Sequence, residues 1–118
     1  MVGGGKNRVV LVTCGTLTEA RRIARVVVTK RLAACVNIVL SPAESVYRWK
    51  NKVEKAREYL LLIKTTSNLL AALEREVKRL HSYDIPEFIA LPIAAGSREY
   101  LSWLGECVKP SARYSVHS

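Results

Sequence analysis

Four side chains with metal-binding or proton-transfer chemistry lie in two short stretches of this 118-residue chain. Cys14 ends a short apolar run, and His81, Asp84 and Glu87 follow closely on one another much later in the sequence. A thiolate, an imidazole and a carboxylate suit copper or zinc better than the harder calcium and magnesium ions. We therefore predict a metal site built from Cys14, His81 and Glu87, provided that the fold brings the two stretches together.

Other roles for these residues stay open. Cys14 at the end of a strand can be a packed, unreactive thiol, and a histidine at the end of a helix can interact with the last carbonyl groups. A nucleophile pair of Cys14 and His81, oriented by Asp84 or Glu87, is conceivable. Nothing in the sequence supplies an evident oxyanion hole, however. We predict a binding protein rather than an enzyme, with no catalytic residue.

A second set of side chains combines aromatic rings with one cation and one anion. Its members are Tyr47, Trp49, Lys64, Tyr83, Glu87 and Trp103. If long hairpins pack around a three-fold axis, these side chains would line clefts between subunits, where their composition suits a small ligand. Aromatic residues at hairpin edges also serve as interface packing, and this interpretation stays open.

Three helices are predicted to position these groups. They are indicated by the helical spacing of apolar residues and by the presence of capping residues. The TLTE sequence at residues 16–19 has the spacing of a capping box and precedes an apolar stripe of helical period. Ser67 is a good cap for a second helix, which we expect to end near His81. Ser97 precedes a short third helix. Each predicted helix carries one apolar face, which is typical of packing on a sheet.

The strands are predicted from β-branched apolar runs. Residues 8–14 and 34–40 give the first two, and Pro42 interrupts pairing after the second because proline lacks the amide hydrogen of a strand ladder. Residues 45–49 and 53–65 flank a tight turn at Asn51 and predict an unusually long hairpin. Residues 87–94 predict the last strand.

This order of elements predicts an α+β fold. The sequence βαββαβ is that of the ferredoxin-like arrangement, with helices on one face of an antiparallel sheet, and here an extra C-terminal helix follows. We expect one domain over residues 8–108. The glycine-rich segment at 1–7 and the polar tail at 109–118, which contains His117, are predicted to be flexible.

Several short sequences in fixed order resemble the CutA family of divalent-cation tolerance proteins. They are VTC at 12–14, RLAACVN at 31–37, SVYRW at 45–49, HSYDIPE at 81–87, FIALP at 88–92 and YLSWL at 100–104. The resemblance implies a ferredoxin-like subunit whose long hairpins close a homotrimer, and a link to copper and other divalent metals. It places metal contacts near Cys14 and His81 and makes copper the favoured ion, to which His117 can add adventitious affinity. CutA-like sequences usually have glycine at the position of Asn51, a departure that affects the turn type.

Composition indicates a cytoplasmic protein without a membrane partner. Hydrophobic residues make up 49% of the chain and charged residues 25%, as in ordinary globular proteins. No apolar run approaches the ~20 residues that a membrane-spanning helix requires. The first residues lack the apolar core of a signal peptide. The three cysteines contain no C-x-x-C pair, which fits reduced thiols.

The net charge of +9 leaves a nucleic-acid partner to be considered. RNA-recognition domains share the βαββαβ order, but their third strand carries stacking aromatics in a Lys/Arg-Gly-aromatic pattern. Residues 58–64 contain one aromatic residue and no glycine. We therefore predict no specific nucleic-acid partner. The alternative function is a trimeric sensor of a small anionic metabolite, by analogy with PII-type signalling proteins.

Overall fold

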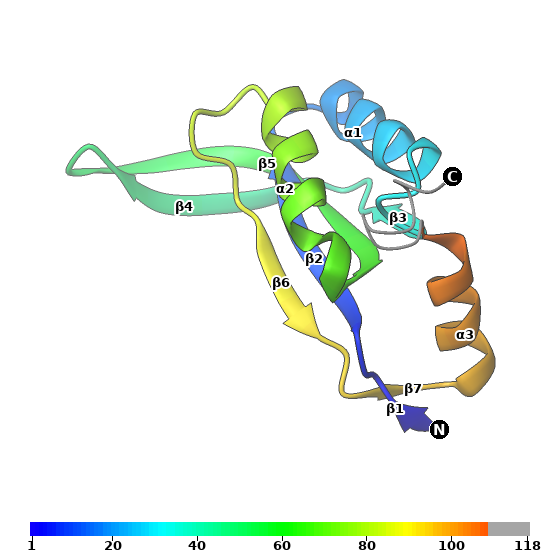
Figure 1. The fold of residues 1–118 in the computed structure, drawn as a ribbon. Helices are drawn as coiled ribbons and strands as arrows, with labels where there is room; N and C mark the ends of the chain where they lie inside the picture. Colours follow the sequence, from blue (N-terminus) through cyan, green and yellow to red (C-terminus); the bar gives the residue numbers. More distant parts are fainter. Residues whose placement is uncertain (109–118) are drawn as a thin grey trace.

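A five-stranded antiparallel sheet forms the centre of the molecule (Figure 1). The structure is a computed structural model and describes residues 1–108, so the predicted tail and His117 lie outside the described residues. Its strands are β2 (Asn7–Cys14), β3 (Cys35–Ile38), β4 (Ala43–Trp49), β5 (Lys52–Thr66) and β6 (Ile89–Pro92). The order is β3-β5-β2-β6, with β4 paired to β5. This order confirms the predicted ferredoxin-like fold.

Two helices cover one face of this sheet (Figure 1). They are α1 (Leu17–Thr29) and α2 (Leu70–Leu80), the latter preceded by the 3-10 turn η1 (Ser67–Leu69). Val10 and Val12 of β2 and Leu61 and Ile63 of β5 are completely buried against the apolar stripes of the helices. Burial of this kind is the main stabilising term of the domain. The predicted extra helix is α3 (Arg98–Cys107), and none of the described helices is long and apolar enough to span a membrane.

The opposite face of the sheet is apolar and less covered. The strand register aligns Val9 with Leu91 and Leu11 with Ile89, so these four side chains point to one face. Ile89 is 46% exposed and Leu91 is 44% exposed. An apolar sheet face that stays in contact with water is typical of an association surface.

The long hairpin formed by β4 and the first half of β5 projects beyond the rest of the domain (Figure 1). Lys50 and Asn51 at its turn both have positive φ, at 49° and 65°. This combination belongs to the two-residue turn that matches the twist of the strands. The hairpin prediction is therefore confirmed, and the chain accommodates the turn without glycine.

Two sequence-based expectations need correction. The segment at 1–7, predicted to be flexible, contains β1 (Val2–Gly3), which pairs with β7 (Ala95–Gly96). Gly4 packs so closely that a Cβ there would lie 1.6 Å from the Ile93 carbonyl oxygen, so glycine permits a backbone contact that a composition argument does not reveal. The last strand of the sheet, predicted over 87–94, is limited to β6.

Candidate metal site and adjoining cavity

Cys14, Glu19 and His81 meet at one end of the sheet. Each offers one ligand atom, and these three atoms lie within 4.8 Å of one another. Cys14 is the last residue of β2, Glu19 lies in the first turn of α1, and His81 caps the C-terminus of α2. The topology brings them together because α1 starts directly after β2, and α2 packs beside α1.

The His81 ring is held by two backbone groups. Its Nε2 donates to the Thr13 carbonyl oxygen at 2.7 Å, and its Nδ1 accepts from the Tyr83 amide at 3.1 Å. A carbonyl can only accept and an amide can only donate, so the ring proton resides on Nε2. Nδ1, whose lone pair accepts from the Tyr83 amide, also lies 3.4 Å from Oε2 of Glu19.

Glu19 is the least satisfied member of the cluster. Its Oε1 accepts from the Ser82 amide at 3.0 Å, whereas its Oε2 is buried without a hydrogen-bond partner among the described residues. A buried acceptor without a donor is costly, and a cation at this point would satisfy it. This orphaned oxygen is the observation that best fits the cluster to a metal ion.

The Cys14 thiol is protonated at neutral pH. Burial raises its pKa to about 12, and the Glu19 carboxylate adds to the increase. A metal ion at this point must therefore displace the thiol proton. The cluster has the right donor types for a soft or borderline ion, but its thiol is no reactive nucleophile, because the thiolate is the reactive form.

The structure brings Cys14 and His81 together, as the sequence predicts, but replaces the carboxylate. Glu87 does not belong to the convergent group found among residues 1–108. The sequence indicates Glu19 only as the last residue of a capping box. One of the two hydrogen bonds of that box forms, because the Thr16 hydroxyl accepts from the Glu19 amide at 3.1 Å. The carboxylate itself turns toward His81 and Ser82. The short distance in sequence between Cys14 and Glu19 is the feature that could have indicated Glu19 as a ligand.

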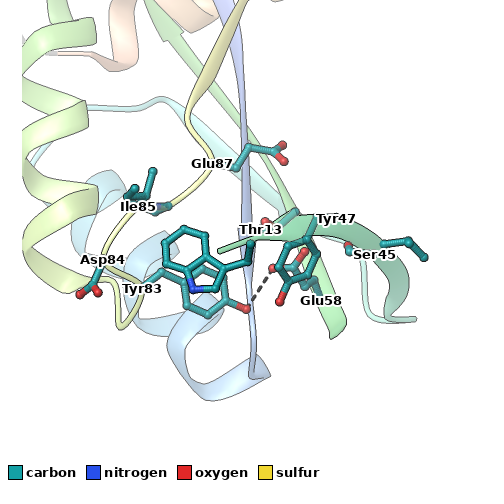
Figure 2. Close-up of a pocket in the computed structure, with 11 residues that line it drawn as sticks. Thr13, Ser45, Tyr47, Glu58, Tyr83, Asp84, Ile85 and Glu87 are labelled. Carbon is teal, nitrogen blue, oxygen red and sulfur yellow. Dashed lines mark hydrogen bonds between the residues drawn. The ribbon is translucent and has the colours of Figure 1, made fainter. Parts of the chain in front are cut away.

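A cavity of about 650 Å³ adjoins the cluster, between the hairpin and the segment at residues 83–87 (Figure 2). Tyr83 joins the two sites, since its ring lies 4.7 Å from the ring of His81, measured between centroids. The cavity is lined by Thr13, Ser45, Val46, Tyr47, Trp49, Glu58, Tyr83, Asp84, Ile85, Pro86 and Glu87.

The cavity lining is acidic and aromatic. Tyr83 donates from its hydroxyl to Oε2 of the buried Glu58 at 2.9 Å (dashed line in Figure 2). Burial, followed by the interaction with Glu58, raises the pKa of Tyr83 to about 12. Burial also raises the pKa of Glu87, and the Glu58 charge adds to this increase. None of the described residues that line the cavity is lysine or arginine, which does not favour an anionic ligand.

Four of the six residues predicted for a ligand cleft line this cavity, namely Tyr47, Trp49, Tyr83 and Glu87. The other two lie elsewhere in the subunit. Lys64 donates to Asn37 on the sheet, and Trp103 packs on Tyr100 of α3 with 5.5 Å between ring centroids. The sequence does not predict Glu58 as a cavity residue. Its position in a long strand does not reveal that it meets the side chain of Tyr83 in a distant loop.

Comparison with known proteins assigns the family. Residues 8–107 match the family described as CutA1 divalent ion tolerance protein. The divalent-cation tolerance protein CutA of Thermus thermophilus is 52% identical over 98 residues, which are 83% of this chain and 94% of that protein.

Solved structures agree with this assignment. The divalent cation tolerance protein from Thermus thermophilus superimposes with a TM-score of 0.85 at 50% identity, covering 87% of this chain and 99% of that one. The structure described as the periplasmic divalent cation tolerance protein CutA from Archaeoglobus fulgidus gives 0.84 at 41% identity, with coverage of 87% and 99%. The chain therefore belongs to the CutA1 divalent ion tolerance family.

Proposed function

We propose that this chain is a cytoplasmic, homotrimeric protein that binds a divalent metal ion, copper in the first place, at Cys14, Glu19 and His81. The observation that carries the proposal is the convergence of three different ligand atoms within 4.8 Å around a buried, unpaired carboxylate oxygen. Divalent ion tolerance is the property named for the family and for the relative from Thermus thermophilus. The donor set of sulfur, nitrogen and oxygen favours copper or zinc over magnesium or calcium.

The residues around the ligands would tune such a site. The hydrogen bond from Nε2 of His81 to the Thr13 carbonyl fixes the ring orientation and leaves Nδ1 as the coordinating atom. Nδ1 would exchange the Tyr83 amide for the ion, and Oε2 of Glu19 would gain the positive partner it lacks. A bound ion would supply this positive charge and require the thiolate form of Cys14. Glu87, the carboxylate predicted from the sequence, remains the alternative third ligand.

Titration calorimetry with Cu²⁺ and Zn²⁺ under argon tests this site. The full chain carries His117→Ala throughout, which removes the adventitious ligand of the tail. We expect Cys14→Ala and His81→Ala each to weaken affinity by about 100-fold, since loss of even an outer partner of a metal ligand costs about 10- to 100-fold. Glu74, a half-exposed residue that pairs with Lys78 on α2, provides the control variant Glu74→Gln.

The third ligand is identified by comparing Glu19→Gln with Glu87→Gln. We expect about a tenfold loss for Glu19→Gln and no change for Glu87→Gln, judged by the cost of losing one partner around a metal. The reverse order would make Glu87 the ligand. Unchanged affinity in the Cys14 and His81 variants would leave both residues with structural roles only and would contradict metal binding at this point.

The trimer is supported by surfaces that the subunit leaves in water. Trp49 is 41% exposed on the projecting hairpin, and Ile89 and Leu91 are similarly exposed on the sheet. Burying such apolar area is the usual driving force of association. Sedimentation equilibrium at micromolar concentration is expected to give three times the subunit mass, and a monomer would contradict the proposed assembly.

A further inference from the structure

The cavity contains a buried carboxylate that is only half used. Glu58 is 8% exposed, and its Oε2 accepts from Tyr83. Its Oε1 has no hydrogen bond or ion pair within residues 1–108. Because Oε1 is not one of the completely buried atoms that lack a partner, it is still accessible from the cavity. A carboxylate this far removed from water calls for a positive partner.

A second carboxylate lies on the same cavity. Glu87 lines it, and the Glu58 charge acts on Glu87. In Figure 2 Glu58 and Glu87 lie on the same side of the view as Tyr47, whereas Asp84 lies on the other side. Like charges that line one cavity repel each other and destabilise the folded protein, and a bound cation would relieve this repulsion. From this arrangement we infer that the cavity binds a small organic cation, namely an amine with an apolar body.

The alternative of a metal ion at this point is less favoured. Glu58, Asp84 and Glu87 do not form a convergent group of three donors of the kind found among the described residues at Cys14, Glu19 and His81. A single small ion needs several oxygens at about 2–2.6 Å, whereas an ammonium group can hydrogen-bond one or two carboxylates and extend away from them. The separation of the acidic groups thus fits a molecule rather than an ion.

The remaining walls suit the body of such a molecule. Rings of Tyr47, Trp49 and Tyr83 border the cavity, and aromatic faces attract cations as well as apolar groups. A volume of about 650 Å³ is in the range of small-ligand sites. The net charge of +9 repels cations from the protein as a whole, so selective binding of an amine would have to come from this local arrangement.

Three probes of one shape test the charge requirement: phenethylamine, 2-phenylethanol and 3-phenylpropionate. They are titrated calorimetrically into the full chain in the presence of a chelator. We expect the amine to bind at least about tenfold more tightly than the alcohol, the difference that about 1.4 kcal/mol of charge-assisted hydrogen bonding produces, and the acid to bind least. Equal affinity for amine and alcohol, or no amine binding at millimolar concentration, would overturn the proposal.

Variants locate the binding site. Glu58→Gln keeps an oxygen that can accept from Tyr83 but removes the charge, and we expect it and Glu87→Gln each to weaken amine binding by about tenfold. Glu44→Gln, an exposed change on β4 outside the cavity lining, is the matched control and should leave binding unchanged. Thermal melts followed by circular dichroism confirm folding. Unchanged amine binding in both cavity variants would refute the assignment.

The proposal does not require a metal ion at Cys14. Cys14→Ala, which removes a proposed metal ligand, is expected to bind phenethylamine as the unmodified chain does, because Cys14 does not line the cavity. Loss of amine binding in this variant would place the cation at the Cys14 cluster and overturn the cavity assignment.

Discussion

The Cys14 cluster and the cavity beside it both hold carboxylates without a cationic partner, yet they differ in the convergence of their donors. At the cluster, sulfur, nitrogen and oxygen atoms meet within 4.8 Å around a fully buried imidazole side chain. In the cavity, Glu58 and Glu87 border an open volume with aromatic walls. Convergence suits an ion, whereas separation across an apolar surface suits a molecule. The spatial spread of donors, more than their chemical type, thus distinguishes the two proposed cation sites, which share Tyr83.

The strongest contrast between the two sites is expected in their pH dependence. Because burial and Glu19 raise the pKa of Cys14 to about 12, binding of each metal ion at neutral pH releases the thiol proton. Metal affinity should therefore rise by about tenfold per pH unit, or about 100-fold from pH ~6 to ~8. Calorimetry in buffers of different ionisation enthalpy measures the released proton. A flat profile would mean that Cys14 is not a ligand.

Amine binding should respond in a different part of the pH scale. Burial and Glu58 raise the pKa of Glu87 above its ordinary value, so Glu87 loses its charge earlier than usual as the solution becomes acidic. We expect amine affinity to vary little around neutrality and to fall in acid. A thiol-like increase across the neutral range would indicate that the amine senses the cluster rather than the cavity.

Removing Tyr83 should damage both sites. Its ring packs against the ring of His81 and its hydroxyl holds Glu58. Tyr83→Ala removes a partly buried ring and should lower the free energy of unfolding by about 2 kcal/mol, below the cost for a fully buried aromatic residue. Amine affinity should fall with it. Urea unfolding and calorimetry measure these effects.

Tyr83→Phe separates the two contributions. Glu58 then loses its hydroxyl donor, which should cost about 1–2 kcal/mol of stability. The tilted ring contact and the backbone contact at His81 remain, so metal affinity should stay unchanged. A loss of metal affinity in Tyr83→Phe would show that the two sites are coupled through the hydroxyl.

Glu76 on α2 provides a reference carboxylate that is fully paired. Hydrogen bonds from Arg79 and Lys30 lower its pKa from 4.5 to about 2. The stabilisation from this depressed pKa is complete above ~4.5 and is lost as the pH falls through about 2. Glu76→Gln should cost about 1 kcal/mol near neutrality, a modest value because both cations are about half exposed, and nothing near pH ~2. Acid unfolding curves measure this difference, and a constant offset would contradict the assigned cause.

The smallest effect is expected at the hairpin turn, remote from both sites. Asn51 has a φ of 65°, which glycine adopts without steric cost. Asn51→Gly should raise the free energy of unfolding by about 0.5 kcal/mol and leave both affinities unchanged. Destabilisation in urea would mean that the extra freedom of glycine in the unfolded chain outweighs the relief at the turn.

Local patterns in the chain were sufficient to predict most of the fold. The spacing of apolar residues and the Thr16 cap predicted the two covering helices. The turn around Asn51 predicted the long hairpin, and together these features predicted the order of the elements. They also placed Cys14 near His81, because the end of the first long strand and the end of the second helix meet in a ferredoxin-like fold. Such features depend on residues close in sequence, whose preferences act whatever the rest of the chain does.

Contacts between distant segments decided the remainder. Glu19 turns from its local cap to the amide of Ser82, and Glu58 in a strand meets the hydroxyl of Tyr83 in a loop. The strand β1 exists only because residues 95–96 pass beside it. The orientation of a side chain and the pairing of a short strand are set by neighbours that folding supplies, since an isolated segment has no burial or hydrogen-bond partner to select one arrangement.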